Sequence, residues 1–170
     1  MNRMQFLRGK FSSETAFRPP WAVSEKDFVD MCDRCGQCIK SCHLKLIKAG
    51  SAGFPEIDFS NGGCDFCQAC VQNCPTDALK LTDINELQPW RLTAEFKNNC
   101  LSERGVVCRA CGDICEMRAI QFKLAVGGVT LVEMNTSEGT GCGECVSVCP
   151  VQAIEIKHLT NNDQLERVNE

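Results

Sequence analysis

Four short stretches of the chain place cysteine at spacings that can hold iron–sulfur clusters. The bacterial ferredoxin spacing is C-x2-C-x2-C-x3-C-P, and its thiolates ligate the irons of cubane clusters. CDRCGQCIKSC (32–42) and CDFCQACVQNCP (64–75) follow the cysteine spacing, and we call them runs one and two. CLSERGVVCRACGDIC (100–115) and GTGCGECVSVCP (139–150) are variants of it, which we call runs three and four.

The spacing predicts which cysteines share a cluster, because in two-cluster ferredoxins the fourth cysteine of a run ligates the other cluster. The first predicted ligand set is Cys32, Cys35, Cys38 and Cys74. The second is Cys64, Cys67, Cys70 and Cys42. The third is Cys100, Cys108, Cys111 and Cys149. The fourth has only Cys142, Cys145 and Cys115.

Run four lacks its first cysteine, because Gly139 stands in that position. Glycine offers no ligand atom, so the fourth iron must be absent or bound by another group. The candidates are Ser137, Glu138, Thr140, water or hydroxide, and a small thiol, and oxygen ligands suit this iron less well than thiolate. The site is expected to hold a [3Fe–4S] cluster, a labile [4Fe–4S] cluster or nothing. We favour a specialised or labile site over an empty one.

The cysteines have two alternative interpretations: structural zinc ligands or, for Cys100, a buried thiol. Structural zinc sites usually divide four ligands into two C-x2-C pairs with a long spacer, whereas here a third cysteine follows at once. Iron–sulfur ligation is therefore favoured, with three [4Fe–4S] clusters expected in the complete sets. In run three, seven residues separate Cys100 from Cys108, so Cys100 is either a ligand at the end of an inserted loop or a buried thiol. We favour ligation.

Composition supports metal binding and limits the other functions. Fifteen cysteines in 170 residues cannot all pair as disulfides, and with no tyrosine and two tryptophans the apolar core is thin. No signal peptide or apolar run of about 18 residues is apparent, so we expect a cytoplasmic protein in which dense cysteine indicates metal. The net charge is −4, and the sequence has no basic stripe, so no nucleic-acid partner is expected.

The segments around the runs indicate an α+β fold. After each fourth cysteine the sequence resembles a helical turn leading into a strand, as in PVQAIEIKHL. AIQFKLAV and VTLVEMN flank Gly127 and Gly128, which predicts a β-hairpin. The spacing from Cys42 to Cys64 (22 positions) nearly equals that from Cys115 to Gly139 (24 positions). We therefore expect two tandem ferredoxin-like units of the bacterial 2[4Fe–4S] type, with small sheets and short helices around the clusters.

The expected domain boundaries follow from these repeats. They are an N-terminal arm (1–26), a first unit (27–83), a linker (84–91), a second unit (92–159) and a polar tail (160–170). The arm contains RPPW at Arg18–Trp21. Two roles for RPPW remain open at this point: an element that docks a partner, or an arm folded back over the first unit.

The chain resembles the NapF family, the ferredoxin-type proteins that accompany periplasmic nitrate reductase. The resemblance is carried by an Arg-Phe-Leu pattern before RPPW, by GFPEIDF leading into run two, by the C-x7-C-x2-C-x3-C spacing of run three, and by CGECVSVCP. Gly139 departs from the family at a cysteine position. His43 and Glu116 stand where proline often follows the fourth cysteine, although the family itself varies there.

The resemblance implies an accessory role. It implies a cytoplasmic protein that assists cluster assembly or redox activation of the nitrate reductase catalytic subunit before export, a client with its own [4Fe–4S] cluster and molybdenum cofactor. The alternative is an electron-transfer ferredoxin or an electron-transfer subunit of a larger oxidoreductase. No catalytic acid–base pair, nucleophile constellation or phosphate loop is apparent, so we do not expect an enzyme.

Overall fold

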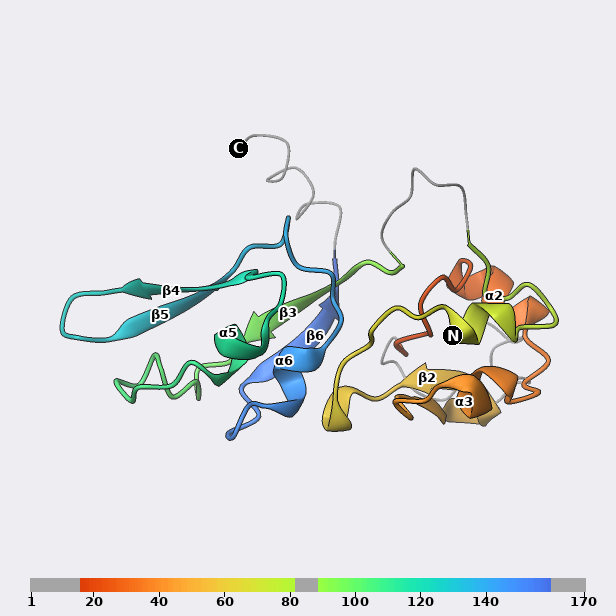
Figure 1. Cartoon of the computed structure of the whole chain (residues 1–170), viewed down its shortest axis with the longest axis horizontal. Helices are drawn as coiled ribbons and strands as arrows, with labels where there is room; N and C mark the ends of the chain where they lie inside the picture. The colour runs from red at the N-terminus through yellow and green to blue at the C-terminus, as the bar shows by residue number, and fades with distance from the viewer. Residues whose placement is uncertain (1–15, 82–88, 160–170) are drawn as a thin grey trace. The chain divides into compact units, whose positions relative to one another are not determined.

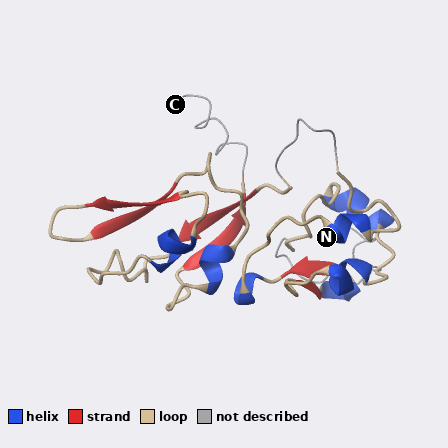
Figure 2. Cartoon of the chain, viewed as in Figure 1, coloured by secondary structure: helices blue, strands red, loops and turns tan. Residues whose placement is uncertain are grey.

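The computed structural model describes residues 16–81 and 89–159. The chain forms two compact units, one from Met1–Asp58 and Phe66–Pro89 and the other from Phe59–Asp65 and Trp90–Glu170. Each unit is small and mixed in secondary structure, with short helices and two-stranded antiparallel sheets (Figure 2). None of the described helices is long and apolar enough to cross a membrane.

The described part of the first unit contains three short α-helices, one 3₁₀ turn and one two-stranded sheet (Figure 1). Its elements are α2 (Glu25–Met31), α3 (Gln37–Ser41), β1 (Ile47–Ala49), η1 (Ser51–Gly53), β2 (Pro55–Ile57) and α4 (Ala69–Gln72). Helix α2 begins where the Ser24 side chain accepts a hydrogen bond from the Asp27 amide, and it buries Phe28 fully. Strands β1 and β2 pair antiparallel from Ile47↔Ile57 to Ala49↔Pro55.

The RPPW segment folds over the first unit, which is the second of the two alternatives raised by the sequence. Pro19 and Pro20 are among its most deeply buried residues. Ala22 pairs with Leu79 in an antiparallel bridge, and the Trp21 carbonyl accepts a hydrogen bond from the Lys80 amide at 3.0 Å. The strand expected after run two is therefore limited to a bridge that the arm completes.

Arg18 anchors this arm through charge and ring contacts. Its guanidinium donates to both carboxylate oxygens of Glu25, at 2.9 and 3.0 Å, and to the Pro55 carbonyl at 3.2 Å. The central carbon of the Arg18 guanidinium lies 5.1 Å from the centre of the Phe28 ring and 5.4 Å from the centre of the Phe54 ring. Such paired and stacked arginines hold segments in one geometry.

The second unit contains two separate antiparallel strand pairs and two cysteine-bearing helices. Its elements are η2 (Phe59–Asn61), β3 (Leu92–Phe96), α5 (Ala110–Ile114), β4 (Ile120–Leu124), β5 (Thr130–Met134), α6 (Glu144–Ser147) and β6 (Ile154–His158). Strands β3 and β6 pair from Leu92↔His158 to Phe96↔Ile154. Their inward side chains, including Leu92, Ala94, Ile154 and Ile156, form a small core.

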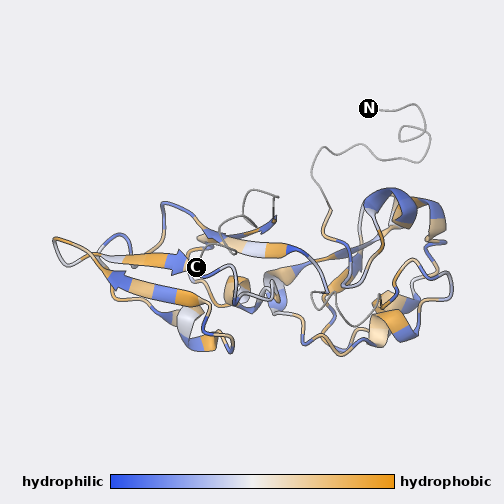
Figure 3. Cartoon of the chain, turned by 90° about the horizontal axis from the view of Figure 1, so that it is seen from above, coloured by the Kyte–Doolittle hydropathy of each residue, from blue (hydrophilic) through white to orange (hydrophobic). Residues whose placement is uncertain are grey.

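The predicted hairpin is present between β4 and β5. Both turn glycines have the left-handed backbone that this tight turn needs, with φ of 88° at Gly127 and 79° at Gly128. The pairing runs from Ile120↔Met134 to Leu124↔Thr130. Apolar and polar residues alternate along β4, whereas β5 has two adjacent apolar residues, of which Val132 is buried and Leu131 is exposed. The apolar and polar positions of the chain are coloured orange and blue in Figure 3.

The segment Phe59–Asp65 belongs to the second unit, whereas the sequence boundaries placed it in the first. The Phe59 ring meets the Trp90 ring edge-on at 5.7 Å. The Gly63 amide donates to the Glu144 carboxylate at 2.6 Å, and the Cys64 amide donates to the Cys142 carbonyl at 2.8 Å. These contacts join residues that are far apart in the chain, which repeat spacing alone does not reveal.

Candidate metal centres

The cysteine at the third position of the ferredoxin spacing lies at the same point of the local structure in every run. It is the second residue of a short helix in all four runs: Cys38 in α3, Cys70 in α4, Cys111 in α5 and Cys145 in α6. The residue before the helix has a left-handed backbone in three runs, with φ of 70° at Gly36, 64° at Gln68 and 83° at Gly143. Run three differs, because Arg109 has φ −134°.

Burial makes these four thiols reluctant to ionise in the absence of iron. It raises the pKa of Cys38 and Cys145 to about 12 and that of Cys70 and Cys111 to about 11, with neighbouring thiols contributing in the same direction. Thiolate is the form that ligates metal, so cluster binding must displace protons from these positions. Cys38 and Cys70 are buried, which suits a ligand whose iron is shielded from water.

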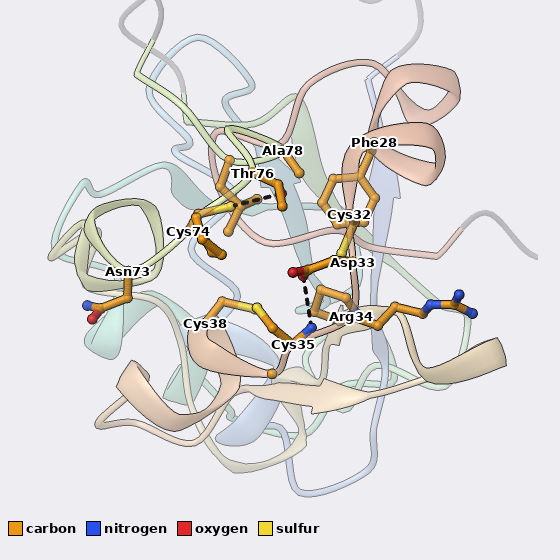
Figure 4. Close-up of a pocket in the computed structure, with 14 residues that line it drawn as sticks. Phe28, Cys32, Asp33, Arg34, Cys35, Cys38, Asn73, Cys74, Thr76 and Ala78 are labelled. Atoms are coloured by element: carbon orange, nitrogen blue, oxygen red, sulfur yellow. Dashed lines mark hydrogen bonds between the residues drawn. The ribbon is translucent and has the colours of Figure 1, made fainter.

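A cavity in the first unit brings together the first predicted ligand set (Figure 4). Cys32, Cys35 and Cys38 from run one line it together with Cys74 from run two. Phe28, Pro55, Ala78 and Leu79 contribute apolar walls. The Asp33 carboxylate accepts a hydrogen bond from the Cys35 amide at 3.0 Å, which fixes the loop between the first two cysteines (Figure 4).

Three members of the second ligand set are grouped in the first unit. The pKa of Cys70 is raised by burial and then by the nearby thiols of Cys67 and Cys42. The Cys67 sulfur also lies 3.8 Å from Nδ1 of His43. Cys64, the remaining predicted member, is in the segment that belongs to the second unit. Its ligation stays a prediction.

Run three folds so that Cys100 lies near the rest of its set despite the long spacing. The pKa of Cys111 is raised by burial, then by the thiol of Cys100, and also by that of Cys108. The inserted loop turns back on itself, with the Arg104 amide donating to the Cys100 carbonyl at 3.2 Å. Ser102 within this loop is 4% exposed. This arrangement supports ligation by Cys100 over the alternative of an isolated buried thiol.

Cys149 is the member of the third set that run four supplies. Its sulfur accepts a hydrogen bond from the Ala153 amide at 3.2 Å. Amide hydrogen bonds to cysteine sulfur raise the reduction potential of a bound cluster, because they stabilise added negative charge. The Ala153 amide is therefore a hydrogen-bond donor suited to a Cys149 thiolate that ligates a cluster.

The incomplete fourth set is also grouped. The pKa of Cys145 is raised by burial, then by the thiol of Cys142, and further by those of Cys111 and Cys115. Cys115 comes from run three and the other two set members from run four, as the crossed pattern predicts. The donors in all four groups are thiols, the soft ligands that iron–sulfur clusters use, so the donor chemistry fits such clusters.

Three candidate residues with oxygen-bearing side chains, Ser137, Glu138 and Thr140, lie close to Gly139 in the sequence. The Ser137 hydroxyl donates to the side-chain oxygen of Asn135 at 2.6 Å, and its side chain is exposed. Glu138 is exposed as well. The Thr140 carbonyl accepts a hydrogen bond from the Trp90 indole at 3.1 Å. Trp90, expected in the linker, thus contacts run four.

Comparison with known proteins identifies the family. A 4Fe-4S dicluster domain matches residues 31–78 and again residues 106–153. The chain is 35% identical to the ferredoxin-type protein NapF of Escherichia coli over 143 residues, which cover 84% of this chain and 85% of the relative. It is 39% identical to NapF of Haemophilus influenzae over 158 residues, covering 83% of this chain and 85% of the relative.

A more distant relative is the methylamine utilization ferredoxin-type protein MauM of Methylobacillus flagellatus. It is 34% identical over 140 residues, covering 75% of this chain and 60% of the relative. These matches agree with the paired cysteine runs and the grouped thiols, since all of them indicate a ferredoxin-type protein. The chain belongs to the NapF family of ferredoxin-type proteins and contains two 4Fe-4S dicluster domains.

Proposed function

We propose that this protein assists maturation of the catalytic subunit of a periplasmic nitrate reductase, acting in the cytoplasm before export. The observation that carries the proposal is the match to NapF proteins over more than four fifths of the chain. The grouped thiols support redox or cluster chemistry. We assign the protein no substrate turnover of its own.

We further propose that all fifteen cysteines are metal ligands in the four sets given above, within two ferredoxin-like units of the bacterial 2[4Fe–4S] type. Three sets hold [4Fe–4S] clusters, and the set of Cys115, Cys142 and Cys145 holds the fourth cluster. The boundaries expected from the sequence, 27–83 for the first unit and 92–159 for the second, are part of this proposal. Clusters supply one-electron transfer when bound, and the protein positions them and controls access of water.

The experiment compares the nitrate reductase subunit purified from cells with and without this protein. If the protein assists maturation, the client from cells lacking it should contain less iron and should be less active with an artificial donor such as reduced viologen. Cells carrying the wild-type gene should restore both. A Cys32→Ser variant, made at a predicted ligand, should restore neither fully.

The same experiment separates the alternative function, electron transfer. An electron carrier would leave the isolated client fully loaded with iron and active with the artificial donor, while turnover with the cellular donor is lost. Co-purification of the two proteins from cytoplasmic extract, with the client still carrying its export signal, tests the partner and the compartment. A normally loaded client, fully active with both donors in cells lacking this protein, would contradict both functions.

A further inference from the structure

The space that a cysteine side chain at position 139 would need is filled by Met134. Gly139 is buried, and a Cβ built on it would overlap the terminal methyl group of Met134. The same Cβ position lies 3.5 Å from the Asn135 carbonyl oxygen and 3.8 Å from Ala119 Cβ. The gap left by the missing cysteine is therefore filled by an apolar side chain from the adjoining strand.

The local fold holds Met134 in this position. Met134 is the last residue of β5, where it pairs with the buried Ile120 of β4. The next amide, of Asn135, donates to the Ala119 carbonyl at 2.7 Å, which keeps the strand end fixed. The Asn135 carbonyl then accepts the Gly139 amide at 3.1 Å, so the chain turns back and brings Gly139 beside Met134.

The part of Met134 that occupies this space is its methyl group, which has no lone pair for iron. A methyl group also disfavours water or hydroxide as a replacement ligand, because a polar group beside it lacks a hydrogen-bond partner. The set of Cys115, Cys142 and Cys145 thus has three thiols, and the position of its missing fourth cysteine has an apolar neighbour. Of the three outcomes expected from the sequence, an apolar neighbour at this position favours the [3Fe–4S] cluster over the labile [4Fe–4S] cluster and the empty site.

We propose that Met134 closes the fourth corner of this site, so that the site holds a stable [3Fe–4S] cluster and excludes a fourth iron. The inference rests on the cysteine ligation proposed above. Its failure is distinguishable from failure of the maturation role, because the test measures clusters in the isolated protein and the client plays no part in it.

The test uses full-length protein purified anaerobically, with electron paramagnetic resonance and iron quantitation before and after Fe²⁺ and dithionite are added. The wild type should show the oxidised three-iron signal and regain it on reoxidation, without taking up iron. In Met134→Ala the corner is open. One electron from dithionite then reduces [3Fe–4S]⁺ to the neutral form, and Fe²⁺ enters to give [4Fe–4S]²⁺ with water as the fourth ligand. Iron should rise by about one per chain, with loss of the three-iron signal.

Further variants distinguish a Met134 side chain that only fills the corner from one that ligates iron. Met134→Leu keeps an apolar side chain without sulfur and should behave as the wild type. Leu131→Ala, an exposed apolar position on the same strand, is the matched control and should also behave as the wild type. Gly139→Cys should form a four-iron cluster incompletely alone, because it meets Met134, and completely when combined with Met134→Ala.

Several results would overturn the inference. Failure of Met134→Ala to take up iron would show that this side chain does not close the corner. A four-iron cluster in the wild type that Met134→Leu loses would assign the thioether as an iron ligand. A four-iron cluster unaffected by either change, or no cluster at this site, would also contradict the proposal.

Discussion

Cys74 belongs to run two, yet it lines the same cavity as Cys32 of run one. Crossed ligation makes the two runs interdependent, since neither can complete this cluster alone. Cys74→Ser should therefore lose the same cluster as Cys32→Ser, about four irons per chain in each case. The double variant should lose no more iron than either single variant, because both substitutions break the same ligand set.

Iron quantitation, together with electron paramagnetic resonance spectra of the reduced proteins, measures how many clusters each variant loses. Loss of about eight irons in the double variant would mean that Cys32 and Cys74 serve different clusters. Ser41→Ala, in the same run but at a side chain that bonds only the Cys38 carbonyl among the described residues, is a suitable control and should keep all its iron.

Cys100→Ser should remove or destabilise the third cluster. The thiol of Cys100 lies near those of Cys111 and Cys108, and serine offers a harder ligand than thiolate. We expect a loss of about four irons, or much faster bleaching in air, relative to wild type. Ser102→Ala, in the same loop, tests whether an effect of Cys100→Ser comes from the loop fold. Unchanged iron and unchanged bleaching in Cys100→Ser would assign Cys100 as a buried thiol.

Arg18→Ala should weaken the first unit. The Arg18 side chain is 9% exposed, pairs with Glu25 and Glu56, and stacks on two phenylalanine rings. Because the two glutamates are partly exposed, we expect a loss of about 2 kcal/mol, less than for a fully buried pair. That corresponds to a fall of roughly 10 °C in the midpoint of thermal cluster bleaching, measured at one heating rate.

Lys48→Ala is the matched control for Arg18. Lys48 pairs with Asp58 at the surface, where both side chains are substantially exposed, so its loss should shift the midpoint little. Equal shifts for the two variants would show that the RPPW arm contributes no special stability.

Acid should accelerate iron loss to a chelator. The four buried cysteines have pKa values raised to about 11 or 12, so each takes up a proton when its iron leaves at neutral pH. Iron affinity should fall about tenfold per pH unit for every thiolate released in the measured step. In the iron-free chain, the raised pKa values stabilise the fold below about pH 9, and this contribution is lost as pH rises towards 12.

The rate of iron loss to a chelator, measured under argon between pH 6 and 8, tests the expected effect of acid. A rate that does not change with pH would mean that iron leaves without protonation of its ligands. The second expectation applies only to iron-free protein and is measured by circular dichroism between pH 8 and 12.

The sequence predicts the parts of the structure that depend on local spacing. The four runs predict which thiols approach one another, and Cys32 with Cys74 is the clearest case, because ligand geometry links spacing directly to position. Gly127 and Gly128 predict the β4–β5 hairpin for a similar reason, since few residues accept that turn.

The remaining features depend on contacts between distant residues. Phe59 joins the second unit through Trp90, and no local pattern marks that pairing. Leu79 pairs with Ala22 of the arm in place of a strand partner within the repeat. Met134 fills the space beside Gly139 because β5 ends and turns there, which requires the strand register to be known.

Iron and acid-labile sulfide quantitation of the anaerobically purified wild-type protein, with resonance spectra before and after reduction, tests the central claim of four cluster sites most directly. The account predicts about fifteen irons and about sixteen sulfides per chain, with an oxidised three-iron signal from the site of Cys115, Cys142 and Cys145. About twelve irons and twelve sulfides, with no three-iron signal, would contradict it and leave only the three complete ligand sets as cluster sites.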